Sequence, residues 1–298
     1  MKRLNAARQG PPSRRSRAAV WRKMEPLPPT RALPGEHKIL SAFGCARCLA
    51  RGTCLPACGA GAAGGGQLVG RRLRVARDAF LYRSGDAVNG LFYAVRYGSF
   101  KTYRADAGGR PRLAGFQLGT DMLGLDAIGL RQHSCTVVAL EDSEVCEVAS
   151  DSMHTKHQHN ATLQRFFHGV LSKEIAREQY LAMLLRNTRA DQRLAAFLLH
   201  LSWRYAARGY SASQFRLAMS RIDIADLLGL TPESVSRLLY RFKQRGLIDL
   251  QGRDISLRDA AGLKAVVVGE GEGDATPPPT TIPPPRRGAE TLPDTGQQ

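Results

Sequence analysis

The pattern of apolar and polar positions first indicates strands. Between about Leu73 and Val148, short apolar runs alternate with turn residues such as Ser84-Gly85-Asp86 and Ala107-Gly108-Gly109. This pattern is typical of short strands joined by tight turns. It predicts a small β-roll or jelly roll over residues 71–150. The runs are Phe80–Tyr82, Leu91–Val95, Phe100–Tyr103, Leu113–Leu118, Thr136–Leu140 and Glu144–Val148.

A helical period replaces the strand pattern from about Thr162 to Thr188, within residues 160–188. Two apolar faces run along this predicted helix. One consists of Phe167, Val170, Leu181 and Leu184, and the other of Leu171, Ile175, Ala182 and Leu185 with Glu178 between them. The second set has heptad spacing, so it predicts a parallel homodimer that the facing Glu178 carboxylates weaken by repulsion. Alternatively, one face is only intradomain core and Glu178 is exposed.

Residues 189–258 contain helix start and stop signals in close succession. An amphipathic segment over Arg189–Ala207 comes first. A shorter one then begins with a capping pattern at Ser220 and ends before Gly229. The next begins at Thr231-Pro232 and ends before Gly246. Two short helices around a Gly-containing turn predict a helix-turn-helix, and the strand signals at 247–250 and 255–257 predict a wing.

The last of these helices has two different faces. Its apolar stripe of Val235, Leu238, Leu239 and Phe242 is predicted to dock on the domain, while Glu233, Ser236 and Arg237 lie on another face. Arg237 can bond a guanine edge with two hydrogen bonds, Glu233 can accept from a cytosine amino group, and Ser236 can reach a base or a phosphate. We therefore predict that these three side chains read DNA. The alternative is a solvated face of a structural helix.

Composition favours a nucleic-acid partner. The net charge is +17, and residues 1–40 alone hold ten Lys/Arg against two Asp/Glu. Such a balance favours DNA or RNA ahead of an acidic membrane surface. Residues 1–38, rich in Arg and Pro, predict a disordered basic arm, and residues 259–298 predict a disordered Pro-rich tail. No apolar run is long enough for a membrane span or a signal peptide, so we expect a cytoplasmic protein without membrane contact.

Residues 39–70 combine clustered thiols with a Gly-rich linker. The cysteines follow the spacing C-x2-C-x5-C-x3-C at Cys45, Cys48, Cys54 and Cys58. Short loops bring such sulfurs together at little entropic cost, and thiolates bind soft metal centres. Spacing alone leaves iron–sulfur, zinc and unligated thiols open, although the absence of a second C-x2-C unit favours a centre that takes one ligand from elsewhere. No motif of enzymatic catalysis stands out.

These motifs, in this order, resemble the Crp/Fnr family of transcription regulators, and the oxygen-sensing Fnr branch in particular. The resemblance covers about residues 43–258. It rests on Cys45-x2-Cys48-x5-Cys54-Leu55-Pro56, Leu123-Gly124-Leu125-Asp126-Ala127-Ile128-Gly129, Val145-Cys146-Glu147, Arg193-Leu194-Ala195-Ala196-Phe197 and Glu233-Ser234-Val235-Ser236-Arg237-Leu238-Leu239.

The resemblance implies a [4Fe-4S] cluster held by Cys45, Cys48, Cys54 and Cys146, which favours the DNA-binding dimer until oxygen converts it. It also implies that Glu178 tunes dimerisation and that Glu233, Ser236 and Arg237 read a palindrome of the TTGAT-N4-ATCAA type. RNA polymerase is then a further partner. One departure from the family is that Gly and Ala replace the apolar helix that usually follows the third cysteine, so we expect less shielding of the cluster.

In the cyclic nucleotide-binding branch of the family, the phosphate pocket needs an Arg in the loop that corresponds to the one before Thr136. This chain has Gln132-His133-Ser134-Cys135 there. We therefore expect no cyclic nucleotide.

The combined prediction is an α+β protein with a β-roll sensor domain, a long dimerisation helix and a winged helix-turn-helix. It acts as a redox-responsive regulator and not as an enzyme. A zinc-binding or cluster-free regulator of the same family is the first alternative, and a zinc-stabilised structural protein that binds nucleic acid is the second.

Overall fold

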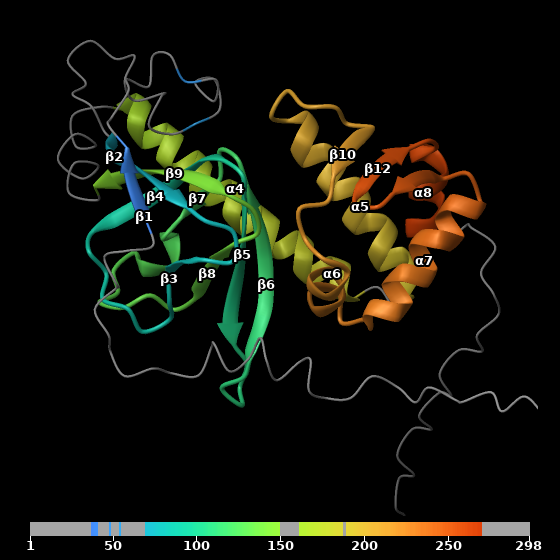
Figure 1. Ribbon diagram of the computed structural model, residues 1–298, viewed down its shortest axis with the longest axis horizontal. Coiled ribbons are helices and arrows are strands. Elements are labelled where there is room, and N and C mark those ends of the chain that lie inside the picture. Colours follow the sequence, from blue (N-terminus) through green and yellow to red (C-terminus); the bar gives the residue numbers. More distant parts are fainter. Residues whose placement is uncertain are drawn as a thin grey trace, which may run out of the picture.

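The computed structural model describes residues 37–40, 48, 54, 69–149, 161–186 and 189–269. A β-rich region and a helix-rich region lie side by side, and the long helix α4 (Ala161–Arg186) passes from one to the other (Figure 1). The predictions for residues 1–36, for most of the cysteine-rich segment and for residues 270–298 lie outside the described residues.

Two antiparallel sheets form the β-roll. The five-stranded sheet has the order β1-β2-β9-β4-β7, and the four-stranded sheet has the order β3-β8-β5-β6. The strands are β1 (His37–Leu40), β2 (Val69–Val75), β3 (Phe80–Tyr82), β4 (Leu91–Tyr97), β5 (Ser99–Ala105), β6 (Pro111–Leu118), β7 (Met122–Leu123), β8 (Thr136–Ala139) and β9 (Ser143–Ala149). All six predicted strand runs are present.

Alternation along the strands separates two apolar clusters. Val145 of β9 packs in the interior of the roll with Val95 and Phe100, whereas Cys146 and Val148 face the opposite side. Successive side chains of a strand point to opposite faces of a sheet, so this division follows from the sequence period. The outer cluster contains Cys54, Phe92, Ala94, Met122 and Val148, with Leu125, Cys146, Phe167 and Val170 packed against it.

Two predicted boundaries at the start of the roll are wrong. The predicted disordered arm extended to residue 38, but His37–Leu40 form β1, which pairs with β2 over Arg72–Val75. The predicted Gly-rich linker extended to residue 70, yet β2 already begins at Val69. Pairing with a neighbouring strand satisfies the backbone groups of these short segments, although their sequence carries little strand signal.

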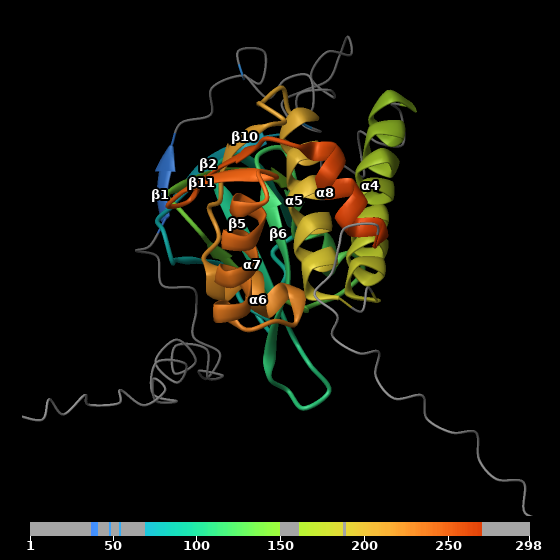
Figure 2. The same cartoon turned by 90° about the vertical axis from the view of Figure 1, so that its right-hand side faces the viewer.

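The two faces of α4 meet different surroundings. Phe167 and Val170 pack on the outer cluster of the roll, and Leu181 and Leu184 pack on the core of the helix-rich region. On the predicted dimer face, Ile175, Glu178, Ala182 and Leu185 are exposed and Leu171 is half-buried. Figure 2 shows α4 at the edge of the molecule beside α5 (Ala190–Ala206).

The helix-rich region is a winged helix-turn-helix. It comprises α5, β10 (Gln214–Arg216), α6 (Arg221–Leu228), α7 (Pro232–Gln244), β11 (Ile248–Gln251), β12 (Asp254–Leu257) and α8 (Ala260–Val268). Ser220 and Asp223 form a full capping box at the start of α6. Gly229 ends α6 in the left-handed region at φ 63°, which a residue without Cβ adopts at low cost.

The predicted disordered tail is wrong at its beginning, because residues 260–268 form α8. Asp259 caps this helix by accepting a hydrogen bond from the Gly262 amide, and Leu263 and Val266 are buried in the core shared with α5. Gly262 and the run Val266–Val268 have low helix propensity, so the local sequence gives a weak signal. Burial of an apolar face stabilises the helix in spite of that.

One apolar core joins the two regions. Phe116 of the roll meets Phe197 of α5 edge to face with ring centroids 6.2 Å apart. Beside it, the Lys101 Nζ lies 2.9 Å from Asp223 Oδ1, and both side chains are largely buried. The β5–β6 hairpin thereby supports α6 (Figure 1). Within the residues that the structure describes, no helix has the length and apolar character needed to span a membrane.

Candidate cysteine site and DNA-binding surface

Helix α7 presents the predicted DNA-reading residues to solvent. Thr231 caps its start by accepting a hydrogen bond from the Ser234 amide, while Val235, Leu238, Leu239 and Phe242 are buried. Glu233, Ser236 and Arg237 are all exposed. The helix lies on the far side of the helix-turn-helix from the roll (Figure 1). A face with one acid, one hydroxyl and one guanidinium is therefore available to a groove of DNA.

Arg241, one turn further along α7, has a structural partner. Its Nη2 lies 3.6 Å from Asp191 Oδ2 at the start of α5, and Arg189 binds the same carboxylate at 2.8 Å. Burial opposes ionisation of Asp191, but the hydrogen bonds and charge of Arg189 outweigh it, so the pKa of Asp191 lies below its usual value. Arg241 thus helps to hold α7 against α5, a role that the sequence pattern did not indicate.

The fold brings two predicted metal ligands from distant parts of the chain into one cluster. Cys54 is buried, and it packs with Met122 and Val148 in the outer cluster, against which Cys146 also packs. Cys146 lies on β9 between Arg72 of β2 and Ala94 of β4. Phe167 and Val170 of α4 pack against the same cluster. The cysteine site therefore touches the helix that carries the predicted dimer face.

Cys48 lies near the charged end of the same sheet face. It contacts Arg96, whose Nη1 is 3.0 Å from Glu144 Oε1. Arg72 binds the same carboxylate oxygen at 3.0 Å. Burial lowers the pKa of Arg96, but Glu144 and Cys48 outweigh that effect and raise it. Glu144 and Cys146 are two residues apart on β9, so their side chains lie on the same face of the sheet. This spacing is the sequence signal that could have placed Glu144 beside the cysteine site.

The donor set of this site suits a soft metal centre. Cys48, Cys54 and Cys146 all belong to the outer side of the five-stranded sheet, and sulfur ligands suit iron–sulfur clusters and zinc. Among the described residues, no three metal-binding side chains are close enough to hold an ion as they stand. Cys45, the remaining predicted ligand, lies outside the described residues.

A second polar group lies inside the roll, around the predicted loop Gln132–Cys135. Asp126 accepts hydrogen bonds from the Ser134 amide at 2.8 Å and from the Tyr82 hydroxyl at 3.2 Å. Although burial opposes ionisation, the hydrogen bonds from His133 and Ser134 lower the pKa of Asp126 to about 2. Burial and the Asp126 charge raise the pKa of the Cys135 thiol to about 12. Cys135 is therefore a protonated core side chain.

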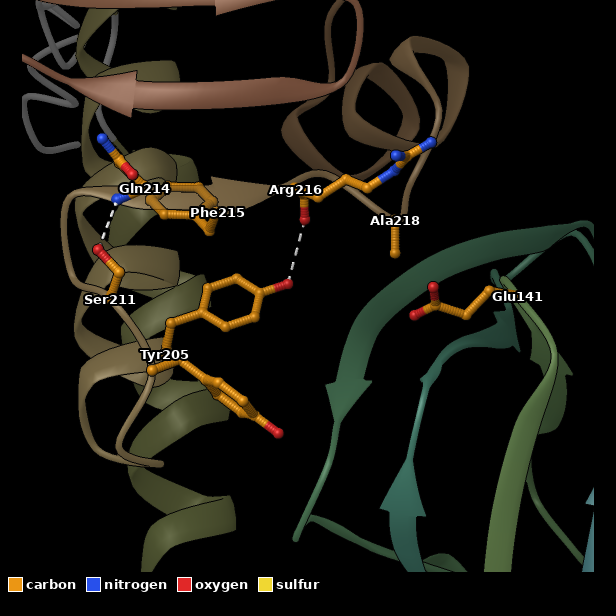
Figure 3. Close-up of a pocket in the computed structure, with 8 residues that line it drawn as sticks. Glu141, Tyr205, Ser211, Gln214, Phe215, Arg216 and Ala218 are labelled. Atoms are coloured by element: carbon orange, nitrogen blue, oxygen red, sulfur yellow. Dashed lines mark hydrogen bonds between the residues drawn. The ribbon is translucent and has the colours of Figure 1, made fainter.

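A hollow of about 330 Å³ lies where the roll meets α5 and β10 (Figure 3). Glu141 of the roll faces it from one side, and Tyr205 and Phe215 stack on the other with ring centroids 5.2 Å apart. The Tyr205 hydroxyl donates to the Arg216 carbonyl at 3.2 Å. Among the residues that the structure describes, neither the cysteines nor the predicted DNA-reading side chains line this hollow.

Comparison with known proteins agrees with this architecture. A family model described as a Crp-like helix-turn-helix domain matches residues 192–266, and one described as a cyclic nucleotide-binding domain matches residues 72–160. The first match ends inside α8, so it includes most of the helix that the sequence pattern did not indicate.

Individual relatives cover the same part of the chain. The transcriptional regulatory protein btr of Bordetella pertussis is 42% identical over 201 residues, which are 67% of this chain and 83% of that protein. The anaerobic regulatory protein of Pasteurella multocida is 39% identical over 196 residues, or 66% of this chain and 71% of that protein. The structure of FixK2 from Bradyrhizobium japonicum superposes with a TM-score of 0.58 at 28% identity, covering 65% of this chain and 94% of that one. Because similarity to regulators extends through both regions, the chain belongs to the Crp/Fnr family of DNA-binding transcription regulators.

Proposed function

We propose that this chain is an oxygen-responsive regulator of anaerobic gene expression, with a [4Fe-4S] cluster held by Cys45, Cys48, Cys54 and Cys146. The observation that carries the proposal is the packing of Cys54 and Cys146 in one cluster beneath α4. The name of the Pasteurella multocida relative supports the anaerobic role. We expect the protein to act in the cytoplasm, without a cyclic nucleotide.

The residues around the cysteines suit such a group. When bound, an iron–sulfur cluster supplies a centre whose integrity depends on oxygen and redox state. Met122, Val148 and Phe167 exclude water on one side. On the other side, the Arg96 guanidinium contacts Cys48.

The position of α4 suggests how the site controls DNA binding. Its inner face packs on the cysteine cluster through Phe167 and Val170. Its outer face carries Leu171, Ile175, Glu178, Ala182 and Leu185, which we assign to a homodimer interface. Loss of the cluster would alter the support of α4 and so weaken the dimer.

A symmetric dimer places two copies of α7 in successive major grooves about one helical turn apart. We assign base contacts to Glu233, Ser236 and Arg237, and a palindromic site of the TTGAT-N4-ATCAA type. Regulation at such a site also requires a contact with RNA polymerase.

The first test follows visible absorption and DNA binding in the same anaerobically purified samples while air is admitted. We expect the broad absorption of an iron–sulfur cluster to decay as binding of the palindrome falls. Cys146→Ala should lose both properties under anoxia, whereas Cys135→Ala, which removes a thiol from the roll core, should keep them. An anoxic Cys146→Ala protein with normal absorption and binding would disprove the ligand assignment. A colourless wild type that binds equally with and without air would favour the zinc-binding or cluster-free alternative.

A further inference from the structure

The tight turn between β6 and β7 is held by Arg204 of α5 and by Arg208, which follows the end of that helix. Arg204 donates from Nη1 to the Phe116 carbonyl at 2.9 Å and binds Asp121 Oδ2 through Nη2. Arg208 binds the other carboxylate oxygen of Asp121 and the Gly119 carbonyl. One carboxylate of the roll therefore receives a guanidinium on each oxygen, one from the last turn of α5 and one from the residues that directly follow it.

These contacts are largely removed from solvent. The side chains of Arg204, Arg208 and Asp121 are 7%, 10% and 19% exposed, respectively. Burial opposes the charge of Asp121, but Arg204 and Arg208 outweigh it and lower the pKa of Asp121. Removing one member of such a group leaves a buried charge without its partner, which is costly. The arrangement therefore resists separation of α5 from the turn.

The turn itself is under local strain. Thr120 has a φ of 74°, an unfavourable value for a β-branched residue. Its amide donates to the Val95 carbonyl at 2.7 Å, and the Val95 amide donates to the Asp121 carbonyl at 2.9 Å. Asp121 Oδ2 also accepts from the Leu118 amide at 2.8 Å. The arginines thus hold a strained turn that is fastened to β4.

The next residue in the chain belongs to the cysteine site. Met122 is buried in the outer cluster with Cys54, and Cys146 packs against that cluster. Ala94, beside Val95 on β4, belongs to the same cluster and pairs with Cys146. Asp121, which binds Arg204 and Arg208, is therefore followed directly in the chain by Met122, which packs in the cysteine site.

We propose that the Asp121-Met122 step transmits the state of the cysteine site to the DNA-binding region, with Asp121, Arg204 and Arg208 as positioning residues. A change around Cys54 and Cys146 displaces Met122, and the turn passes that displacement to α5. This route acts within one subunit and is additional to the dimer face of α4. The proposal rests on the proposed function for its physiological input, but the coupling can be tested without a cluster.

The first experiment measures the DNA affinity of the full-length protein before and after exposure to air, at protein concentrations that keep both states dimeric. Allosteric coupling usually corresponds to about 5- to 150-fold in affinity. We expect Asp121→Asn to reduce the wild-type ratio at least about fivefold. Asp126→Asn is the matched control, since the Asp126 side chain is also buried in the roll but, among the described residues, makes its hydrogen bonds and ion pair within the roll. An unchanged ratio in Asp121→Asn would overturn the proposal.

The second experiment uses cluster-free full-length protein and measures alkylation of Cys54 and Cys146 by iodoacetamide, with and without saturating palindromic DNA. If bound DNA changes the arrangement around Cys54 and Cys146, the access of the reagent to these thiols changes, so we expect DNA to change the alkylation rates about fivefold in wild type and in Asp126→Asn. Asp121→Asn should abolish the change. Arg208→Lys, which keeps the charge but not the forked hydrogen bonding, should reduce it and serves if Asp121→Asn does not fold.

The two experiments separate the two proposals. If the DNA affinity of wild type does not change on exposure to air, oxygen sensing is contradicted. The alkylation rates alone then test the coupling between the cysteine site and the DNA-binding region. Equal DNA effects on alkylation in wild type and Asp121→Asn, or none in wild type, would refute the link even if the cluster senses oxygen.

Discussion

At the scale of single residues, His200 shows how burial changes the chemistry of one side chain. Its ring stacks on Tyr180 with centroids 4.4 Å apart, and within the described part of the chain its Nε2 is buried without a hydrogen-bond partner. Burial, followed by the positive charges of Arg204 and Arg177, lowers the pKa of His200 to about 4. The imidazole is therefore neutral in the folded protein at neutral pH.

This shift predicts a pH dependence of stability. The unfolded chain binds a proton at His200 below about pH 6.5, whereas the folded protein does so only below about pH 4. The contribution of neutral His200 to the free energy of unfolding is therefore complete above pH 6.5, and it is lost as the pH falls toward 4. Wild type should therefore lose about 3 kcal/mol of unfolding free energy through His200 between pH 6.5 and pH 4, and His200→Asn should not show this loss in urea unfolding. Carboxyl groups titrate in both proteins and cancel, so parallel stability curves would show that His200 is not shifted.

At the scale of elements, α8 illustrates a helix that packing stabilises. Its apolar residues Leu263 and Val266 are buried, and Asp259 caps its first turn. Nothing in the run Ala260–Val268 predicts a strong isolated helix, because Gly and β-branched residues make up much of it. The stability of α8 therefore depends on its contact with α5.

We expect Leu263→Ala to destabilise the DNA-binding region by about 2–5 kcal/mol, because it leaves a cavity in a fully buried position. Thermal unfolding monitored by circular dichroism provides the measurement. Lys264→Ala, at the adjacent exposed position, is the control and should change stability by less than about 0.5 kcal/mol. Equal and small effects of both substitutions would mean that α8 does not contribute to the folded core.

At the scale of the whole molecule, the exposed face of α4 is the surface that we assign to the homodimer interface. Ile175 and Leu185 are 58% and 45% exposed in the single chain, and Glu178 lies between them in the heptad pattern. The Arg177 Nη2 lies 3.7 Å from Glu178 Oε1 and offsets part of its charge. In a parallel dimer, the remaining repulsion between the two carboxylates would oppose association.

Glu178→Gln should therefore strengthen dimerisation by up to about fivefold, since it removes the charge and preserves the shape. Analytical ultracentrifugation of cluster-free protein measures the change. Lys173→Gln alters the net charge at an exposed position off the heptad set and should leave the dimer constant unchanged. An unaltered dimer constant in Glu178→Gln would place Glu178 outside the interface, and a weaker dimer would contradict the predicted repulsion.

The sequence alone determined most of the helices and strands and the exposed face of α7. Strand alternation, the Ser220–Asp223 capping box and the buried stripe of α7 depend on residues a few positions apart, so their physical effects can be read locally. Elements with weak local signals, such as β1, β10 and α8, were missed because pairing and packing stabilise them. The cysteine ligand set rested on family resemblance, since spacing left several metal chemistries open.

Only the tertiary structure decided which distant groups meet. Cys54 and Cys146 share one apolar cluster, and ion pairs join Asp121 to Arg204 and Asp191 to Arg241, although the chain keeps these segments apart. No local period encodes such a contact, because it depends on how sheets and helices pack around a shared core. Packing also determined which charges lose their solvent, and therefore which pKa values move.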